Sequence, residues 1–295
     1  MKELVVISGK GGTGKTSTVA SFAALAPRPV LADCDVDAAD LHLILSPTIR
    51  DRADFVGGNR ATIDPERCIG CGACQEYCRF DAIHPTPEGG YRVEPIACEG
   101  CGVCARFCPG EAINFSPAVN GEWFVSDTRH GPMVHARLGI AEENSGKLVT
   151  LVRKKARETA EKWGLNLIVA DGSPGVGCPV MASLTGADAV LLVTEPTPSG
   201  FHDLDRVVQL LRRFRLPAMV CVNKADLNLE VTEQIEKYAI ERGLQVAGRI
   251  PYSPAVTEAQ TAGLSVVEYG DNDAAESLRT IWDRVAQMLQ LTPNF

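Results

Sequence analysis

The chain has 295 residues, of which 45% are apolar and 22% are charged, and its formal net charge is −8. This composition can build a large buried core and excludes a disordered or low-complexity chain. The acidic balance argues against a nucleic-acid-binding protein, because such proteins usually carry a basic patch. No run of about 18 apolar residues occurs, so we expect no transmembrane helix and no stable membrane insertion.

The chain opens on a strand-like run, Leu4-Val5-Val6-Ile7, which a glycine-rich stretch follows at once. That run is too short for the apolar region of a signal peptide, so we expect a cytoplasmic protein. Eight of the eleven cysteines fall between Cys68 and Cys108. In a cytoplasmic chain, such clustering indicates metal binding rather than disulfide bonds.

Short apolar runs alternate with helical stretches through most of the chain. Strands are predicted at 3–8, 29–33, 165–170, 188–194, 217–222 and 245–250. Helices are predicted at 15–25, 147–163, 201–214, 230–242 and 274–290. The strands are almost continuously apolar, as strands buried on both faces are. The alternation predicts an α/β fold with a mostly parallel sheet and helices on both of its faces.

Residues 57–118 interrupt this alternation, because they hold the clustered cysteines and no long helical pattern. The predicted domains are therefore a first part of the α/β domain at 1–56, an inserted α+β domain at 57–118, a β-ribbon connection at 119–149 and a second part of the α/β domain at 150–295. The ribbon is predicted from two strand-like triplets, at 123–125 and 133–135, with a Gly/Pro turn between them.

Three surface features leave alternatives open. The basic helix 147–163 is interpreted as a solvated face, or as a docking surface for an acidic partner. The segment 142–147 is a candidate partner or inter-subunit loop. The helix 274–290 is expected to pack on the sheet, with a membrane-surface helix as the alternative. Its apolar face consists of Leu278, Ile281, Trp282, Val285 and Leu289.

A glycine-rich phosphate loop follows the first predicted strand. Its residues are Gly9, Lys10, Gly11, Gly12, Thr13, Gly14, Lys15, Thr16 and Ser17, which fit the pattern G-x4-G-K-[ST]. Backbone N–H groups and the N-terminus of the next helix would surround the phosphates. Lys15 would reach the β- and γ-phosphates, and the Thr16 hydroxyl would bind Mg²⁺.

The cysteines form two Cys-x2-Cys-x2-Cys-x3-Cys runs. The first run is Cys68, Cys71, Cys74 and Cys78, and the second is Cys98, Cys101, Cys104 and Cys108. Both resemble the runs of bacterial ferredoxins with two [4Fe–4S] clusters, in which the fourth cysteine of a run binds the other cluster. The resemblance implies one cluster on Cys68, Cys71, Cys74 and Cys108, and another on Cys98, Cys101, Cys104 and Cys78.

Zinc is the rival metal, but zinc sites usually pair short Cys-x2–4-Cys halves across a longer gap. One residue departs from the ferredoxin pattern. Pro109 follows the second run, whereas Arg79 stands where the first run would have proline. Because proline fixes φ and lacks an N–H group, we expect a different local loop around Cys78.

Lys10, directly after the first glycine of the loop, makes the sequence similar to the MinD-like ATPases with a deviant Walker A motif. That group includes the nitrogenase iron protein and the Mrp-type iron–sulfur carriers, and this chain resembles its members with an inserted ferredoxin domain. The resemblance implies an ATP-dependent homodimer in which Lys10 reaches the nucleotide of the second subunit. It also implies that Asp35, in the switch I segment 32–37, activates water, that Asp33 and Asp171 support Mg²⁺, and that Asp171 begins switch II.

The segment Val222-Asn223-Lys224-Ala225-Asp226 follows a predicted strand. Taken alone, it matches the N-K-x-D sequence with which GTPases bind guanine. In the MinD-like group the corresponding asparagine contacts adenine, which makes Asn223 the expected adenine contact and Pro251 an expected wall of the site. ATP is the favoured nucleotide and GTP the alternative.

Three cysteines lie outside the two runs. Cys34 and Cys221 stand in apolar strand contexts, so we expect them in the core. Cys178 follows the predicted switch II aspartate by seven residues. It is interpreted as a structural residue, or alternatively as a thiol at the dimer seam.

The parts together suggest three functions. The first is ATP-dependent electron transfer to a metalloenzyme or to its maturation machinery. The second is an iron–sulfur or metal-cofactor carrier, although no cysteine occurs after Cys221 to form the C-terminal Cys-x2-Cys pair of the Mrp group. The third is a positioning switch without redox chemistry.

Overall fold

The computed structural model describes residues 1–139 and 144–291. The chain divides into two compact units. The first unit comprises 1–52, 123–137 and 145–295, and the second comprises 53–122 and 138–144. The second unit is therefore an insertion, and we describe each unit by itself.

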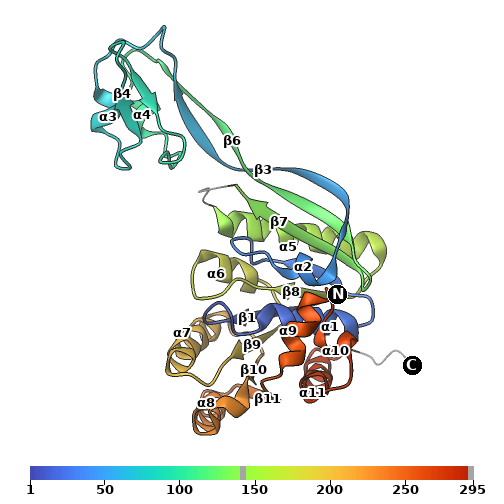
Figure 1. Ribbon diagram of the computed structural model, residues 1–295. Helices are drawn as coiled ribbons and strands as arrows, with labels where there is room; N and C mark the ends of the chain where they lie inside the picture. Colours follow the sequence, from blue (N-terminus) through green and yellow to red (C-terminus); the bar gives the residue numbers. More distant parts are fainter. Residues whose placement is uncertain (140–143, 292–295) are drawn as a thin grey trace. The chain divides into compact units, whose positions relative to one another are not determined.

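A nine-stranded sheet has the strand order β11-β10-β9-β1-β8-β2-β7-β6-β3 (Figure 1). Its strands are β1 (Lys2–Ser8), β2 (Val30–Asp33), β3 (Thr48–Ile63), β6 (Ile113–Asp127), β7 (Pro132–Leu138), β8 (Leu167–Asp171), β9 (Ala189–Thr194), β10 (Ala218–Asn223) and β11 (Gln245–Ile250). The pairs from β11 through to β7 are all parallel. Both β3 and β6 begin in one unit and end in the other.

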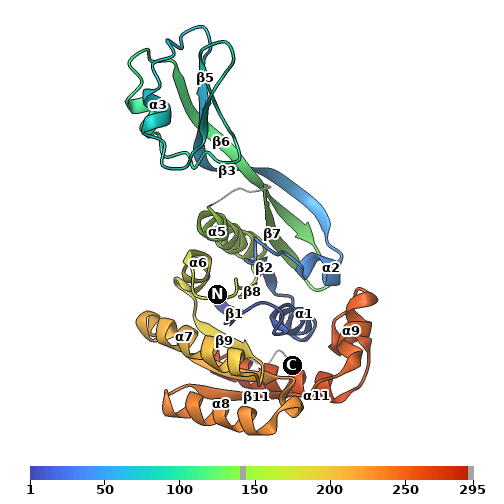
Figure 2. The same cartoon turned by 60° about the vertical axis from the view of Figure 1, so that its left-hand side comes forward.

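Helices cover both faces of this sheet in the first unit (Figure 2). On one face lie α1 (Lys15–Leu25), α9 (Pro254–Thr261), α10 (Val266–Tyr269) and α11 (Asp273–Met288). On the other face lie α5 (Ser145–Trp163), α6 (Cys178–Leu184), α7 (Pro198–Phe214) and α8 (Leu229–Glu241). The predicted α/β class is confirmed, and each predicted strand and helix ends within three residues of the observed bounds.

The C-terminal helix α11 packs on β11 and α1. The predicted apolar face, including Leu278 and Val285, is buried, and the rings of Phe22 and Trp282 lie 5.0 Å apart. Packing on the sheet is confirmed for this helix. None of the helices within 1–139 and 144–291 has the length and apolar character needed to span a membrane.

Helix α5 is not wholly a solvated face. Arg153 is buried, and its Nε donates to Glu3 Oε1 at 2.6 Å. Arg157 donates to the other Glu3 oxygen at 2.7 Å. A buried charge needs a paired partner, so these two arginines tie α5 to the start of β1. The prediction of a solvated face is wrong for Arg153.

Strand β3 was not predicted from the sequence. Its first seven residues are exposed and include charged side chains, so no apolar pattern marks them. The strand exists because it lies beside β6 in the sheet. The short helices α2 (Leu41–Leu45), α6, α9 and α10 and the 3₁₀ turn η1 (Ala225–Leu227) also have too few residues for a clear period.

The second unit contains two similar short helices, α3 (Ala73–Glu76) and α4 (Val103–Arg106), which contact each other. Each follows a glycine with positive φ, 78° at Gly72 and 75° at Gly102, a conformation that favours glycine. Strands β4 (Ile83–Pro85) and β5 (Tyr91–Val93) form an antiparallel pair. Residues 142 and 143 of the candidate partner loop lie outside the described residues.

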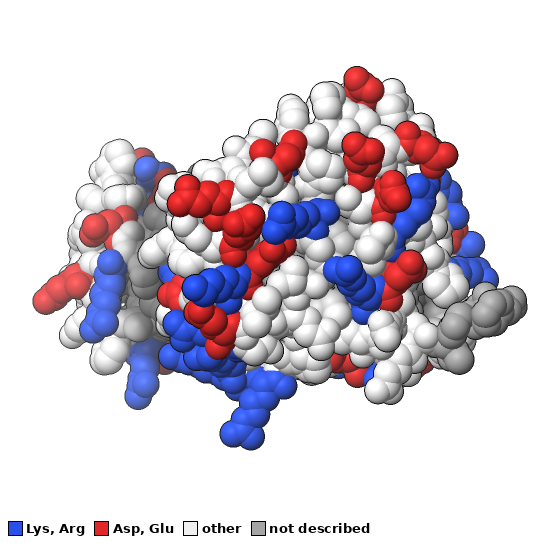
Figure 3. All heavy atoms as spheres, turned by 90° about the horizontal axis from the view of Figure 1, so that it is seen from below, with Lys and Arg blue, Asp and Glu red and all other residues white. Residues whose placement is uncertain are grey.

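Charged side chains of both signs lie intermixed on the face of the molecule seen in Figure 3, with one group of basic side chains near its lower edge. The net charge of −8 is thus not carried by a single acidic area of this face.

Candidate nucleotide site and cysteine cavities

The phosphate loop joins the buried strand β1 to helix α1, as its motif requires. Gly14 precedes α1 with φ of 92°. A Cβ on Gly14 would lie 2.2 Å from Asn223 Nδ2, and a Cβ on Gly9 would lie 2.5 Å from Asp203 Cβ. Neither position has room for a side chain. The phosphate loop therefore packs directly against Asn223 at the end of β10 and against Asp203 in α7.

Three carboxylates surround Lys15. Its ammonium is hydrogen-bonded to Asp171 and lies 3.3 Å from Asp35 Oδ2. Thr16 Oγ1 donates to the second Asp171 oxygen at 2.7 Å. Asp33 stands opposite Asp171 in the parallel register of β2 and β8. The start of α1 and the ends of β2 and β8 thus bring together five residues that the sequence analysis assigned to one site.

The group around Lys15 holds three carboxyl groups and one ammonium. Burial, followed by the nearby Asp171, raises the pKa of Asp33 well above its usual value. Although burial alone would lower the pKa of Lys15, the neighbouring carboxylates raise it. Asp33 Oδ2 is buried and has no hydrogen-bond partner among the described residues. A group of three carboxylates and one ammonium fits Mg²⁺, which prefers carboxylates, water and substrate phosphates.

A link between the two predicted switch segments was missed in the sequence. Ser173 follows Asp171, and its hydroxyl donates to the Cys34 carbonyl at 2.6 Å. The Gly175 N–H donates to the Ser8 carbonyl at 2.8 Å. Because serine and glycine are common in loops, no sequence pattern distinguishes these two contacts.

Lys10 lies beside the start of α7 rather than in the Lys15 cluster. Its Nζ is 2.5 Å from Glu195 Oε1 and 3.0 Å from Ser199 Oγ. Glu195 was not identified from the sequence, since a single glutamate after a strand carries no motif.

The base-binding segment is held by its own side chains. Asn223 Nδ2 donates to the Thr13 carbonyl at 2.8 Å, which ties this segment to the phosphate loop. Asp226 Oδ1 accepts from the Tyr252 N–H at 2.6 Å, and Pro251 immediately precedes Tyr252. One oxygen of Asp226, the residue that would accept from guanine, is thus engaged within the chain, which is a reason to expect adenine rather than guanine.

We expect ATP to bind at least about fivefold more tightly than GTP, because guanine would have to displace an internal hydrogen bond. Asp226→Ala should weaken both nucleotides to a similar degree, since it frees the loop at Tyr252. Fluorescence titration with labelled ATP and GTP analogues measures this. A selective loss of GTP binding would instead assign Asp226 to guanine.

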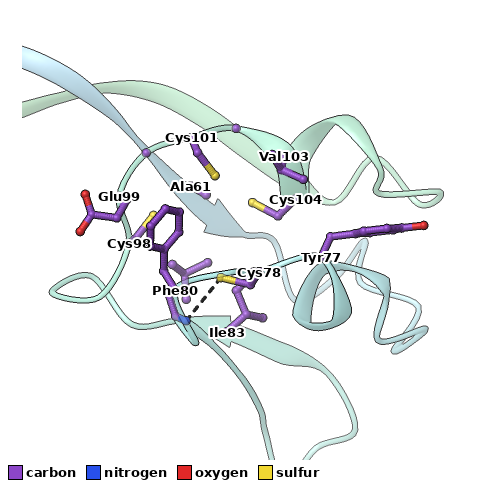
Figure 4. Close-up of a pocket in the computed structure, with 14 residues that line it drawn as sticks. Ala61, Tyr77, Cys78, Phe80, Ile83, Cys98, Glu99, Cys101, Val103 and Cys104 are labelled. Carbon is purple, nitrogen blue, oxygen red and sulfur yellow. Dashed lines mark hydrogen bonds between the residues drawn. The ribbon is translucent and has the colours of Figure 1, made fainter.

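Two cavities in the second unit collect the eight clustered cysteines. Cys78, Cys98, Cys101 and Cys104 line one cavity (Figure 4), and Cys68, Cys71, Cys74 and Cys108 line the other. Each cavity takes three cysteines from one run and the fourth from the other run. The remaining lining residues are mainly apolar, such as Ile83 and Val93 in one cavity and Ile63 and Ile113 in the other.

Cys78 and Cys108, the last cysteines of the two runs, each accept a backbone hydrogen bond on sulfur. The Ala82 N–H donates to Cys78 Sγ at 3.4 Å, and the Ala112 N–H donates to Cys108 Sγ at 3.3 Å. Burial raises the pKa of the Cys74 and Cys104 thiols. Metal binding would therefore have to replace tightly held protons on these two residues.

Four thiols on an apolar cavity fit the donor set of a [4Fe–4S] cluster. Within the described ranges, no three His, Cys, Asp or Glu side chains lie close enough to hold a single metal ion. A cubane does not need such closeness, because each of its irons takes a different thiolate.

The other three cysteines differ in exposure. Cys34 and Cys221 are buried, as predicted, and burial raises the pKa of Cys221 to about 12. Cys178 is exposed at the start of α6, so it does not belong to the core as those two cysteines do, and both interpretations of its role stay predictions.

Comparison with known proteins places this geometry in context. Residues 4–266 match the CobQ/CobB/MinD/ParA nucleotide binding domain. The uncharacterized protein MJ0578 of Methanocaldococcus jannaschii is 34% identical over 230 residues, which are 77% of this chain and 79% of that protein. An iron-sulfur cluster carrier protein of Pyrococcus abyssi is 28% identical over 160 residues, which are 49% of this chain and 53% of the carrier.

Solved structures show the same fold at low identity. MinD of Pyrococcus horikoshii, complexed with Mg-ADP, has a TM-score of 0.58 at 17% identity and covers 97% of this chain and 96% of its own. An ATP complex of McdA from Cyanothece has a TM-score of 0.60 at 15% identity, with 100% and 98% covered.

Proposed function

Since the chain belongs to the CobQ/CobB/MinD/ParA family of P-loop ATPases, we propose that it is an ATP-driven, two-cluster iron–sulfur protein that transfers electrons to a partner metalloenzyme or its maturation machinery. The cross-run distribution of cysteines over two cavities is the observation that carries this proposal. A cluster in either cavity would be bound by four thiolates and would have no open ligand position, which suits electron relay better than release of the cluster.

The residues of the nucleotide site have distinct roles in this proposal. Lys15 neutralises the phosphates, and Thr16 and Asp171 hold Mg²⁺ with support from Asp33. Asp35, 3.3 Å from Lys15 and buried, orients the attacking water. Asn223 and Pro251 bound the adenine.

Lys10 acts on the nucleotide of a second copy, so hydrolysis requires a homodimer with ATP between the subunits. A second cation there offsets charge on the transferring phosphoryl group.

The cysteine unit supplies the redox part. Bound [4Fe–4S] clusters supply one-electron chemistry. The chain contributes the thiolate ligands, apolar walls that limit water, and the N–H groups of Ala82 and Ala112 directed at sulfur. Strands β3 and β6 each run from one unit into the other. Ser173 ties switch II to the Cys34 carbonyl, so loss of the γ-phosphate is sensed on both switch segments.

A carrier function is the second candidate, because relatives that align with half of this chain are named iron-sulfur cluster carrier proteins. In that case a cluster would leave the cavity for an acceptor protein. Incubation of the loaded protein with an apo-ferredoxin, followed by separation and iron analysis, tests this second function.

The proposal is tested by an anaerobic redox titration followed by EPR, with no nucleotide, with ADP and with a non-hydrolysable ATP analogue. We expect the analogue to shift a cluster potential by about 30–60 mV, where about 59 mV corresponds to tenfold coupling for one electron. Lys15→Ala is the control, since it removes nucleotide binding and should remove the shift. Equal potentials in all three states, together with iron transfer to the apo-protein, would favour the carrier.

A further inference from the structure

Glu195 joins the phosphate loop to the base-binding segment. It lies between β9 and α7, and its side chain is only 15% exposed. Oε1 is 2.5 Å from Lys10 Nζ, and Oε2 is 3.3 Å from Lys224 Nζ. Although burial alone would raise its pKa, the two lysines hold the pKa of Glu195 below its usual range. The carboxylate is therefore ionised at neutral pH.

The segment that carries Glu195 is held in one geometry. Thr197 caps α7, and its hydroxyl accepts from the Gly200 N–H at 3.0 Å. A Cβ on Gly200 would lie 2.3 Å from the Glu195 carbonyl oxygen. Asp203, one turn further along α7, is packed against Gly9 of the phosphate loop. The start of α7 is thus a fixed support beside Lys10.

We propose that Glu195 is a positioning residue that, together with Ser199, orients Lys10 toward the phosphates of a second subunit. An ammonium has three N–H donors. Glu195 and Ser199 can accept two of them, which leaves one donor for an incoming phosphate oxygen. Lys224 shares the carboxylate, so the three charged groups keep a net positive charge for the phosphate. This inference rests on the proposed function, because it assumes that Lys10 acts across a dimer.

The physical gain is preorganisation. A lysine without a partner must be ordered each time the dimer forms. Ordering one long side chain lowers the equilibrium constant for reaching the active arrangement by about two- to tenfold. Within the described residues, the Glu195 side chain bonds to Lys10 and Lys224 but not to Lys15, Asp35 or Asp171. Its removal should therefore slow turnover without weakening nucleotide binding within the subunit.

The test is Glu195→Gln in the full-length protein loaded with iron and sulfide. We expect kcat to fall by about two- to tenfold, with an unchanged affinity for a non-hydrolysable ATP analogue and an unchanged thermal unfolding midpoint. Glu158→Gln is the matched control, because Glu158 also accepts from a lysine, Lys155 at 2.8 Å, but lies on α5. That control should leave kcat unchanged.

A double variant separates this inference from the function beneath it. In a Lys10→Ala background, Glu195→Gln should have no further effect, since the two residues act as one unit. A kcat of Glu195→Gln equal to or above that of the unmodified protein overturns the inference, as does a loss that persists without Lys10. If Lys10→Ala alone hydrolyses ATP at the full rate, the assigned role of Lys10 fails first, and the inference fails with it.

Discussion

Lys15→Ala should lower ATP hydrolysis by at least about 100-fold and also destabilise the nucleotide-free protein. The first effect follows from losing the cation that stabilises charge on the transferring phosphoryl group. The second follows because Asp171 and Asp33 are fully buried, and Asp35 nearly so, and Lys15 is the ammonium that they share. Breaking a buried charge pair by removing one partner costs about 3–5 kcal/mol. Phosphate release and urea unfolding at pH 7 measure the two effects.

Lys10→Ala is the matched control for this variant. Lys10 pairs with Glu195 at the rim of the site, and its side chain is about a third exposed. We expect Lys10→Ala to lower hydrolysis to a measurable residual rate, while its free energy of unfolding changes by no more than about 1 kcal/mol. If Lys15→Ala were as stable as the unmodified protein, the three carboxylates would not depend on Lys15 for charge balance.

The second large effect is expected at Cys78, which belongs to the first cysteine run but lines the cavity of the second run. Cys78→Ser should remove the cluster of Cys98, Cys101 and Cys104, although Cys78 belongs to the first run, because Cys78 lines that cavity. Iron and acid-labile sulfide should each fall from about eight to about four atoms per chain, since each cluster holds four irons. Cys108→Ser should remove the other cluster and give the same iron content.

EPR of the two reduced variants distinguishes them, because each variant should retain a different cluster spectrum. Cys178→Ser is the control, as Cys178 is exposed and lines neither cavity. It should keep full iron. Retention of the Cys98–Cys101–Cys104 cluster spectrum in Cys78→Ser would show that each run holds its own cluster, and this would contradict the cross-run assignment.

Local patterns in the sequence determined the fold class and much of the site. Continuous apolar runs marked the parallel strands, and the phosphate loop could be placed because a strand precedes it and a helix follows it. Asp33 and Asp171 each end such a run, and the resemblance to the MinD-like group assigned them to the Mg²⁺ site. These features depend on neighbouring residues alone, so a single sequence contains them.

The tertiary structure decided which residues meet across long separations. The charged strand β3 exists through its place beside β6, and Arg153 is buried because Glu3 is there to pair with it. Glu195 reaches Lys10 across 185 positions, and Asp226 accepts from the Tyr252 N–H. No local pattern encodes such contacts, because the free energy of each one depends on a partner that only the folded chain brings within hydrogen-bond distance.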